Sequence, residues 1–222
     1  MTKENLQVLK QQLVRNTIFE AAIDLFATKG FDETTVEEVA QAAGVSRRSF
    51  FRYFASKDDL LAQNVVHYGV ALTAAITACP ATFTPLEIVR ETVLSVAKQS
   101  VAHPRTRQVI DISERSASAR QAHLSRLMEV EEKVAQAFAA RLKNAAKEDL
   151  KPRLLAGLTI TCVNVAIMSW HKGENQDTST AAKQVFANLA RIFCDPTNSS
   201  EARVNVPSRR KKVGPLKRRG SA

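Results

Sequence analysis

Glycine and proline are scarce in this sequence, with seven of each among 222 residues. Between them lie long stretches rich in Ala, Leu, Val, Glu, Lys and Arg, several of which strongly favour helices. The composition is otherwise ordinary for a globular protein, with 45% hydrophobic and 24% charged residues. We therefore expect an all-α protein of one domain or two small ones.

Cysteine is also rare, and its three positions are far apart: Cys79, Cys162 and Cys194. None belongs to a CxxC pair or to a His/Cys pattern with metal-ligand spacing. Reduced, buried thiols are the expected state, which fits a cytoplasmic protein.

The sequence lacks the patterns that carry most enzymatic chemistry. It has no Gly-rich phosphate loop, no Ser-His-Asp order and no metal constellation. The four histidines show no paired ligand spacing; they are His67, His103, His123 and His171. We therefore predict no enzymatic activity, no metal and no cofactor.

Uninterrupted apolar runs of membrane-spanning length are missing as well. The longest apolar stretch, from Leu154 to Trp170, is broken by two threonines, Asn164 and Ser169. This stretch is expected to form a buried helix and not a membrane span. The polar N-terminus, Met1 to Asn5, does not match the apolar core of a signal peptide.

Apolar residues recur at three-to-four spacing, which predicts about nine helices. In the first helix the spacing forms one stripe that we expect to be buried: Leu9, Leu13, Ile18, Ala22, Leu25 and Phe26. The predicted helices span residues 3–29, 36–43, 46–53, 57–78, 85–101, 105–117, 119–147, 152–171 and 179–194.

Two short helices, over residues 35–54, are joined by a sharp turn. Thr35 and Glu38 form a capping box that begins the first helix. Gly44 can adopt the left-handed conformation that ends it, and Ser46 caps the next helix. This order predicts a helix-turn-helix whose helices cross at a steep angle.

The second of these helices concentrates positive charge. The segment from Gly44 to Lys57 has four basic residues and no acidic residue. Phe50 and Phe54 should anchor the helix, and the outer side then carries Arg47, Arg48, Ser49 and Arg52. Arginines in this position can reach guanine in the DNA major groove, which indicates a recognition helix. The alternative is a basic amphipathic helix of the kind found in any helical protein.

Three stretches resemble the N-terminal signature of the tetracycline-repressor (TetR) family: Ile18 to Phe31, Thr34 to Ser46, and Phe50 to Leu61. The resemblance covers about residues 14–61. It implies a three-helix DNA-binding domain, a larger helical effector domain with a ligand cavity, and a homodimer on a palindromic operator. We accordingly expect a helix-turn-helix domain over 1–56, a ligand-binding and dimerisation domain over 57–195, and a basic tail over 196–222.

The same resemblance assigns roles to single residues. Thr35, Tyr53 and Lys57 are expected to contact phosphate, whereas Arg47, Arg48, Ser49 and Arg52 are expected to face the groove, with Ser46 at the start of their helix. Phe51 departs from the family, which usually has Tyr there, so only apolar contacts to sugar or a thymine methyl are open to it.

For the effector domain the sequence leaves more alternatives open. Six residues are candidates for lining a ligand cavity, although each could be ordinary core: His67, Phe83, Met128, Asn164, Met168 and Trp170. The segment from His103 to Arg107 is faintly similar to family members that bind acyl-coenzyme A-like ligands. Apolar stripes on the last two helices predict a four-helix bundle between two subunits.

Most of the net charge of +10 lies in the tail, since residues 196–222 have eight Lys/Arg against one Asp/Glu. Apolar periodicity stops there, so we expect a disordered segment. The tail could grip DNA without sequence preference, or it could be a solvated tail that aids solubility.

The sequence thus predicts a ligand-responsive transcriptional regulator, a repressor released by a small hydrophobic effector. We expect it to be cytoplasmic and nucleoid-associated. The alternative is a broad-specificity DNA-binding protein without a small ligand.

Overall fold

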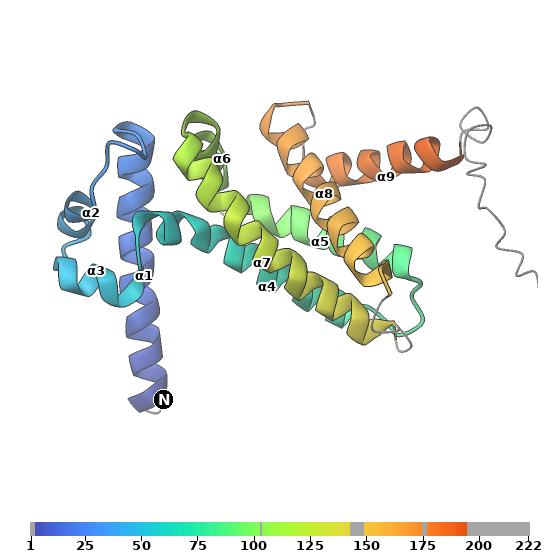
Figure 1. Cartoon of the computed structure of the whole chain (residues 1–222), viewed down its shortest axis with the longest axis horizontal. Coiled ribbons are helices and arrows are strands. Elements are labelled where there is room, and N and C mark those ends of the chain that lie inside the picture. Colours follow the sequence, from blue (N-terminus) through green and yellow to red (C-terminus); the bar gives the residue numbers. More distant parts are fainter. Residues whose placement is uncertain (1–2, 103, 143–148, 175–176, 195–222) are drawn as a thin grey trace, which may run out of the picture. The chain divides into compact units, whose positions relative to one another are not determined.

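The computed structural model describes residues 3–102, 104–142, 149–174 and 177–194 (Figure 1). These residues form nine α-helices and no strand, which confirms the expected all-α class. The helices are α1 (Lys3–Thr28), α2 (Val36–Ala42), α3 (Arg47–Tyr53), α4 (Lys57–Ala78), α5 (Pro85–Ala102), α6 (Thr106–Arg115), α7 (Ala117–Arg141), α8 (Lys151–His171) and α9 (Thr178–Cys194).

Contacts divide the chain into one unit over Met1–Phe186 and a second over Ala187–Ala222. The second unit contains the C-terminal part of α9, and the tail over 196–222 lies outside the described residues. Everything described below, apart from that part of α9, belongs to the first unit.

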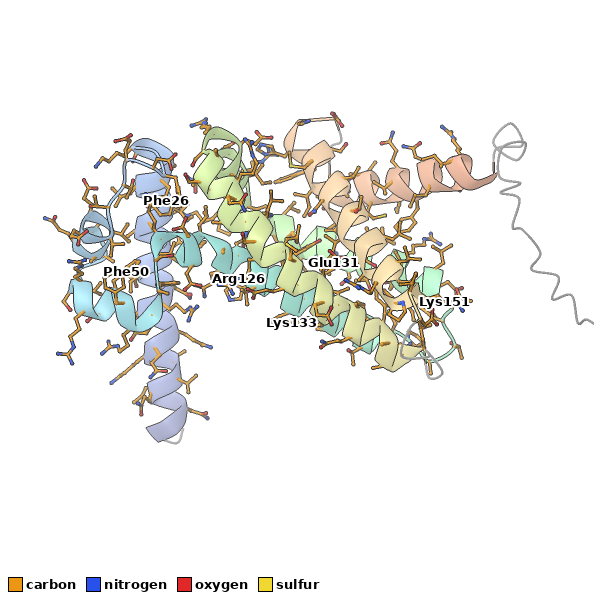
Figure 2. The ribbon with its side chains drawn as sticks, viewed as in Figure 1. Phe26, Phe50, Arg126, Glu131, Lys133 and Lys151 are labelled. Atoms are coloured by element: carbon orange, nitrogen blue, oxygen red, sulfur yellow. The ribbon has the colours of Figure 1, made fainter. Side chains whose placement is uncertain are left out.

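The first three helices enclose a small core. Phe26 on α1 and Phe50 on α3, both labelled in Figure 2, are buried, and so is Val39 on α2. Phe26 and Phe31 pack edge to face with ring centroids 4.9 Å apart, a favourable geometry for aromatic pairs. This core positions the short α3, which is too short to be stable alone.

The stripe expected on α1 is buried only over its C-terminal half. Ile18 and Ala22 are fully buried, whereas Leu9 is 53% and Leu13 is 66% exposed. The N-terminal part of α1 extends past α2 and α3 (Figure 1), so its apolar residues have no helix of this core to pack against. The expectation of one continuous buried stripe was therefore wrong for Leu9 and Leu13.

Helices α4 to α8 form the larger helical region. The long helices α4 and α7 lie side by side, and α8 packs against both α5 and α7. Gly69 allows the close approach of α4 and α7, because a β-carbon there would lie 2.7 Å from Cγ2 of Val130. Helix α8 is apolar and long enough to cross a membrane by length and composition, as core helices can be, and Ala156 and Val163 are fully buried in it.

Around α6 and α7 the helix boundaries differ from the expectation by more than one residue, whereas the other boundaries agree within one residue. The sequence predicted helices over 105–117 and 119–147, whereas α6 ends at Arg115 and α7 begins at Ala117. Ser116 causes the break, because its hydroxyl accepts a hydrogen bond from the Ala119 amide at 3.1 Å and caps α7. Residues 143–147 lie outside the described part of the chain.

Helix α6 links the two groups of helices. Val109 and Ile112 belong to the same buried cluster as the core of α1, α2 and α3. Arg105, just before α6, forms ion pairs with Glu20 and Asp24 on α1, each at 2.5 Å. Contacts therefore cross the boundary that we expected at residue 56.

Two of the three cysteines, Cys79 and Cys162, are free and buried, as expected. Burial raises the pKa of both thiols, so they are protonated at neutral pH. The side chain of Cys194 lies outside the described residues.

Candidate nucleic-acid interface

The start of α2 has the capping box expected from the sequence. The Thr35 hydroxyl accepts from the Glu38 amide at 3.2 Å, and the Glu38 carboxylate accepts from the Thr35 amide at 2.9 Å. Lys29 adds an ion pair to Glu38 at 2.6 Å. The hydrogen bond from Lys29, followed by those from Thr35, lowers the pKa of Glu38 to about 2. Thr35 therefore lies at the helix start, where its side chain is exposed and already bonded to Glu38.

The turn between α2 and α3 also follows the expectation. Gly44 has φ +66°, a left-handed conformation that costs glycine little. Its neighbour Val45 donates its amide to the Ala40 carbonyl at 2.9 Å, which closes the turn. Ser46 then caps α3, since its hydroxyl accepts from the Ser49 amide at 3.1 Å.

Two phenylalanines hold α3 in place. Phe50 and Phe54 are 0% and 1% exposed, with ring centroids 5.7 Å apart. The guanidinium of Arg15 on α1 lies 4.8 Å from the Phe54 ring centroid, a cation–π contact. The burial of both phenylalanines confirms the expectation from the sequence. The contact with Arg15 was not expected, because no pattern in the sequence indicated it.

The outer side of α3 is exposed and basic. Arg47, Arg48 and Arg52 are exposed, and Ser49 is partly buried between them and the cap. Arg47 forms an ion pair with Glu37 on α2 at 2.9 Å, and its guanidinium lies 5.5 Å from the Phe51 ring centroid. The positive charge expected on α3 is therefore partly neutralised by α2, and the sequence had not predicted this ion pair.

The C-terminal end of α3 carries an arginine–tyrosine pair. Arg52 lies over the Tyr53 ring at 5.0 Å and donates to the Tyr53 hydroxyl at 3.3 Å. Phe51 is 45% exposed, which leaves its ring available for apolar contact.

Lys57 has a different environment from the one expected. Its ammonium donates to the carbonyls of Phe31, Asp32 and Thr34 at 2.7, 3.0 and 3.2 Å, and it lies 4.7 Å from the Phe31 ring centroid. An ammonium has three N–H groups, and all three have acceptors here. Lys57 therefore ties α4 to the turn after α1, which is at odds with a phosphate contact.

The six candidates for a ligand cavity are not brought together in either of two hollows of the molecule. An open hollow of about 770 Å³ lies between α4 and α7 and is bordered by Asp59 and Arg126, which pair at 2.8 Å. A second, of about 550 Å³, lies between the α1–α2 turn and α6. Of the six, His67 and Met128 are exposed, Met128 by 75%, and the following four are partly buried: Phe83, Asn164, Met168 and Trp170.

One cluster was not expected at all. The ligand atoms of Asp111, Glu114 and His171 lie within 4.8 Å of one another, an arrangement that could hold a metal ion. We expected no metal because the histidines show no ligand spacing along the chain. Asp111 and Glu114 come from α6 and His171 from the end of α8, so only the packing of these helices reveals the cluster.

Comparisons with known proteins agree with this architecture. The model of the N-terminal domain of "Bacterial regulatory proteins, tetR family" matches residues 18–63. The model of the "MftR C-terminal domain" matches residues 83–193. The chain belongs to the TetR family. Members of this family are transcriptional regulators with a helix-turn-helix, and not enzymes.

Curated relatives in the TetR family include the regulator TcmR of Streptomyces glaucescens. It is 26% identical over 179 residues, which cover 78% of this chain and 79% of TcmR. The putative mycofactocin biosynthesis regulator MftR of Mycobacterium tuberculosis is 51% identical over 41 residues, 18% of this chain and 21% of MftR.

Among solved structures, NalD of Pseudomonas aeruginosa, a secondary repressor of a multidrug efflux pump, has a TM-score of 0.57 at 19% identity. The match covers 82% of this chain and 96% of NalD. SmeT in complex with triclosan has a TM-score of 0.55 at 19% identity, over 79% of this chain and 91% of SmeT. These likenesses support the TetR fold.

Proposed function

We propose that this TetR-family regulator is a ligand-responsive repressor that binds a palindromic operator as a homodimer. The observation that carries the proposal is the outer side of α3, where Arg47, Arg48 and Arg52 are exposed on a helix anchored by buried phenylalanines. A rigid helix with exposed arginines suits the major groove, where arginine can bind guanine O6 and N7 together.

Within this helix we divide the residues by role. Arg48 is the foremost base reader, because it is exposed and has no ion pair within the described residues. Arg47 and Ser49 assist it, and Arg47 exchanges Glu37 for DNA. The resemblance placed Arg52 in the groove; because Arg52 is paired with Tyr53, we assign both to one phosphate at the far end, where they offer several donors to one anion.

The remaining positions of the interface have smaller roles in this proposal. Thr35 and Ser46 cap α2 and α3 with exposed side chains, and in this proposal their hydroxyls contact phosphate oxygens. Phe51 contributes apolar contact to sugar or to a thymine methyl.

For dimerisation we propose α8 and α9. On α8, Leu154 and Val165 are 69% and 50% exposed, and Leu158 between them is only partly buried. These residues follow an i, i+4, i+11 spacing along one side of the helix, and a second copy of the chain would cover them. On α9, Val185 and Phe186 are partly buried and would extend the same kind of apolar surface.

The effector that we propose is a small hydrophobic molecule, with long-chain acyl-coenzyme A as the first candidate. Support comes from the triclosan bound to SmeT and from the matched solved structure of a fatty acid degradation regulator, FadR of Bacillus halodurans. The effector would shift the population between two arrangements of the larger helical region. Helix α6 would pass the change to α1, because it packs against the N-terminal core. A regulator of this kind acts in the cytoplasm, at the nucleoid.

The test is fluorescence anisotropy with fragments tiled across the region upstream of the protein's own gene, with unrelated DNA as a competitor. Arg48→Ala should weaken binding to the preferred fragment by about 5- to 150-fold, the value of one bidentate base contact. Arg90→Ala removes an exposed arginine on α5 and should leave the affinity unchanged. Equal loss in both variants, or no preference over unrelated DNA at any salt concentration, would favour the broad-specificity alternative.

The effector is tested on the same preferred fragment. Palmitoyl-coenzyme A should release the DNA and raise the melting temperature of the free protein. Palmitate and coenzyme A, added separately, are the controls. If palmitoyl-coenzyme A does neither, this class of effector is excluded.

A further inference from the structure

The clustered side chains of Asp111, Glu114 and His171 lie between α6 and α8. The His171 Nε2 is 3.2 Å from Asp111 Oδ1 and 4.0 Å from Glu114 Oε2. Asp111 and Glu114 are three residues apart on one helix, so their carboxylates project from the same side of α6. His171 faces both from the last residue of α8.

The electrostatics of the cluster suit a dication. The two carboxylates supply a formal charge of about −2, and a histidine that ligates a metal does so as the neutral imidazole. Both helices also end at the cluster, α6 at Arg115 and α8 at His171. Helix C-termini carry partial negative charge, so both ends favour a cation between them.

The ligands differ in exposure in a way that fits metal uptake. The imidazole of His171 is only 11% exposed, whereas the carboxylates of Asp111 and Glu114 are 43% and 51% exposed. A fixed nitrogen ligand is therefore combined with two oxygen ligands that can adjust to the roughly 2.0–2.2 Å metal–ligand distances of Zn²⁺. Water can reach the remaining coordination positions from the exposed side.

A neighbouring contact holds the two helices in register. The guanidinium of Arg107 on α6 lies 3.9 Å from the Trp170 ring centroid, and Arg107 also donates to the His171 carbonyl at 3.5 Å. The end of α8 is thereby held against α6 without any help from the cluster itself. The two helices that carry the ligands are thus positioned before a metal arrives, which reduces the cost of binding.

We infer that Asp111, Glu114 and His171 bind a divalent transition-metal ion that joins α8 to α6. One imidazole and two carboxylates match Zn²⁺ best, with water completing its coordination. Mg²⁺ and Ca²⁺ prefer sets made only of oxygen ligands, so they bind this cluster weakly.

The metal also has a route to the DNA-binding helices. Helix α6 packs into their core through Val109 and Ile112, and Arg105 pairs with Glu20 and Asp24 on α1. Fixing α6 to α8 restricts the motion of α6 relative to α1 and so changes DNA affinity. This coupling rests on the proposed function, whereas metal binding itself does not.

The first experiment titrates Co²⁺ into the full-length chain after removal of metals with a chelator, and records the visible absorption of bound Co²⁺. We expect one Co²⁺ per chain, displaced by Zn²⁺ but not by Mg²⁺. His171→Gln should weaken binding by at least about tenfold, the lower end of what even outer-shell changes cost at metal sites. His123→Gln, at a partly buried histidine on α7 outside the cluster, should bind as the wild type does.

If His171→Gln does not fold, Asp111→Asn and Glu114→Gln test the site in its place. Both carboxylates are about half exposed, and the amide side chains that replace them have the same shape, so these variants should fold. Each should weaken Co²⁺ binding, and Glu91→Gln, a change at an exposed carboxylate on α5, should not. Absence of saturable Co²⁺ binding, or wild-type binding by all three cluster variants, would overturn the site.

The second experiment measures DNA affinity with and without Zn²⁺. We expect a change of at least about fivefold for the wild type, the lower end of the usual range for coupled sites, and none for Asp111→Asn. Zn²⁺ binding with unchanged DNA affinity would overturn the coupling alone. If the protein bound no DNA, the proposed function would fail, while the Co²⁺ titration would still decide the site.

Discussion

Arg47 on α3 and Glu37 on α2 form an ion pair, with 2.9 Å between Nε and Oε1. The side chains are 67% and 55% exposed, so solvent screens the pair and it contributes little to folding. In the proposed interface the pair matters for binding, because Arg47 would have to leave this carboxylate to reach DNA.

We predict that Glu37→Gln strengthens DNA binding. The substitution frees Arg47 and removes a negative charge that faces the phosphate backbone, so affinity should rise by about three- to tenfold at low salt. Stability should change by less than about 1 kcal/mol. Anisotropy measurements on Glu37→Gln, Arg47→Ala and the double variant give the coupling, and additive effects of the two changes would contradict the prediction.

Gly69 should not tolerate a side chain. Alanine at this position places a β-carbon 2.7 Å from Val130 Cγ2, where α4 and α7 are in contact. Overpacking of this kind should lower the free energy of unfolding by about 1–3 kcal/mol, measured by urea denaturation.

Gly157 on α8 is the matched control, because the nearest atom to its added β-carbon is Glu131 Oε1 at 3.9 Å. Gly157→Ala should be neutral or stabilising by up to about 1 kcal/mol, since alanine favours helices. Val130→Ala should relieve the clash in the double variant with Gly69→Ala. A Gly69→Ala protein as stable as the wild type would show that the helices separate freely.

Substitution of Lys57 distinguishes a structural role of this residue from a DNA-binding role. Loss of its three hydrogen bonds to carbonyls in Lys57→Met should lower the free energy of unfolding by about 1–3 kcal/mol. Lys98→Met, at an exposed position on α5, should be neutral. If Lys57 instead contacted a phosphate, Lys57→Met would leave the free energy of unfolding unchanged. The slope of the logarithm of DNA affinity against the logarithm of salt concentration would then fall in magnitude by about one.

Glu38 should make the protein sensitive to acid. Its pKa is lowered in the folded state to about 2, so its carboxylate stabilises the fold above the unfolded-state pKa. This stabilisation is lost progressively as the pH falls from about 4.5 towards 2. Urea denaturation at several pH values should therefore show a weaker pH dependence in this window for Glu38→Gln than for the wild type.

Lys29→Met tests the cause of that shift, because the hydrogen bond from Lys29 lowers the pKa of Glu38 more than any other contact. In Lys29→Met the free energy of unfolding should depend less on pH than in the wild type. The double variant with Glu38→Gln should depend on pH almost as Glu38→Gln does alone. Identical acid profiles for Glu38→Gln and the wild type would refute the assignment.

Much of the DNA-binding region could be predicted from short-range patterns. Thr35 with Glu38, Gly44 and Ser46 each act through hydrogen bonds or backbone angles within a few residues, and the structure has each in the expected role. Phe50 and Phe54 were also expected in the core, because their spacing of four places them on one side of a helix.

The larger helical region was less predictable. Met128 looked like a cavity residue because it is large and apolar, yet its 75% exposure depends on which side of α7 faces α4 and α8. Leu9 and Leu13 were misjudged in the same way, since periodicity marks the apolar side of a helix but not whether another helix covers it.

Local sequence thus decides where the helices of this protein begin and end and which side of α3 carries arginine, because caps, turns and side-chain spacing act over a few residues. Tertiary packing alone decides what those side chains meet. It pairs Arg47 with Glu37, directs Lys57 to three carbonyls and brings His171 to Asp111, since residues on different helices become neighbours only when their buried surfaces pack together.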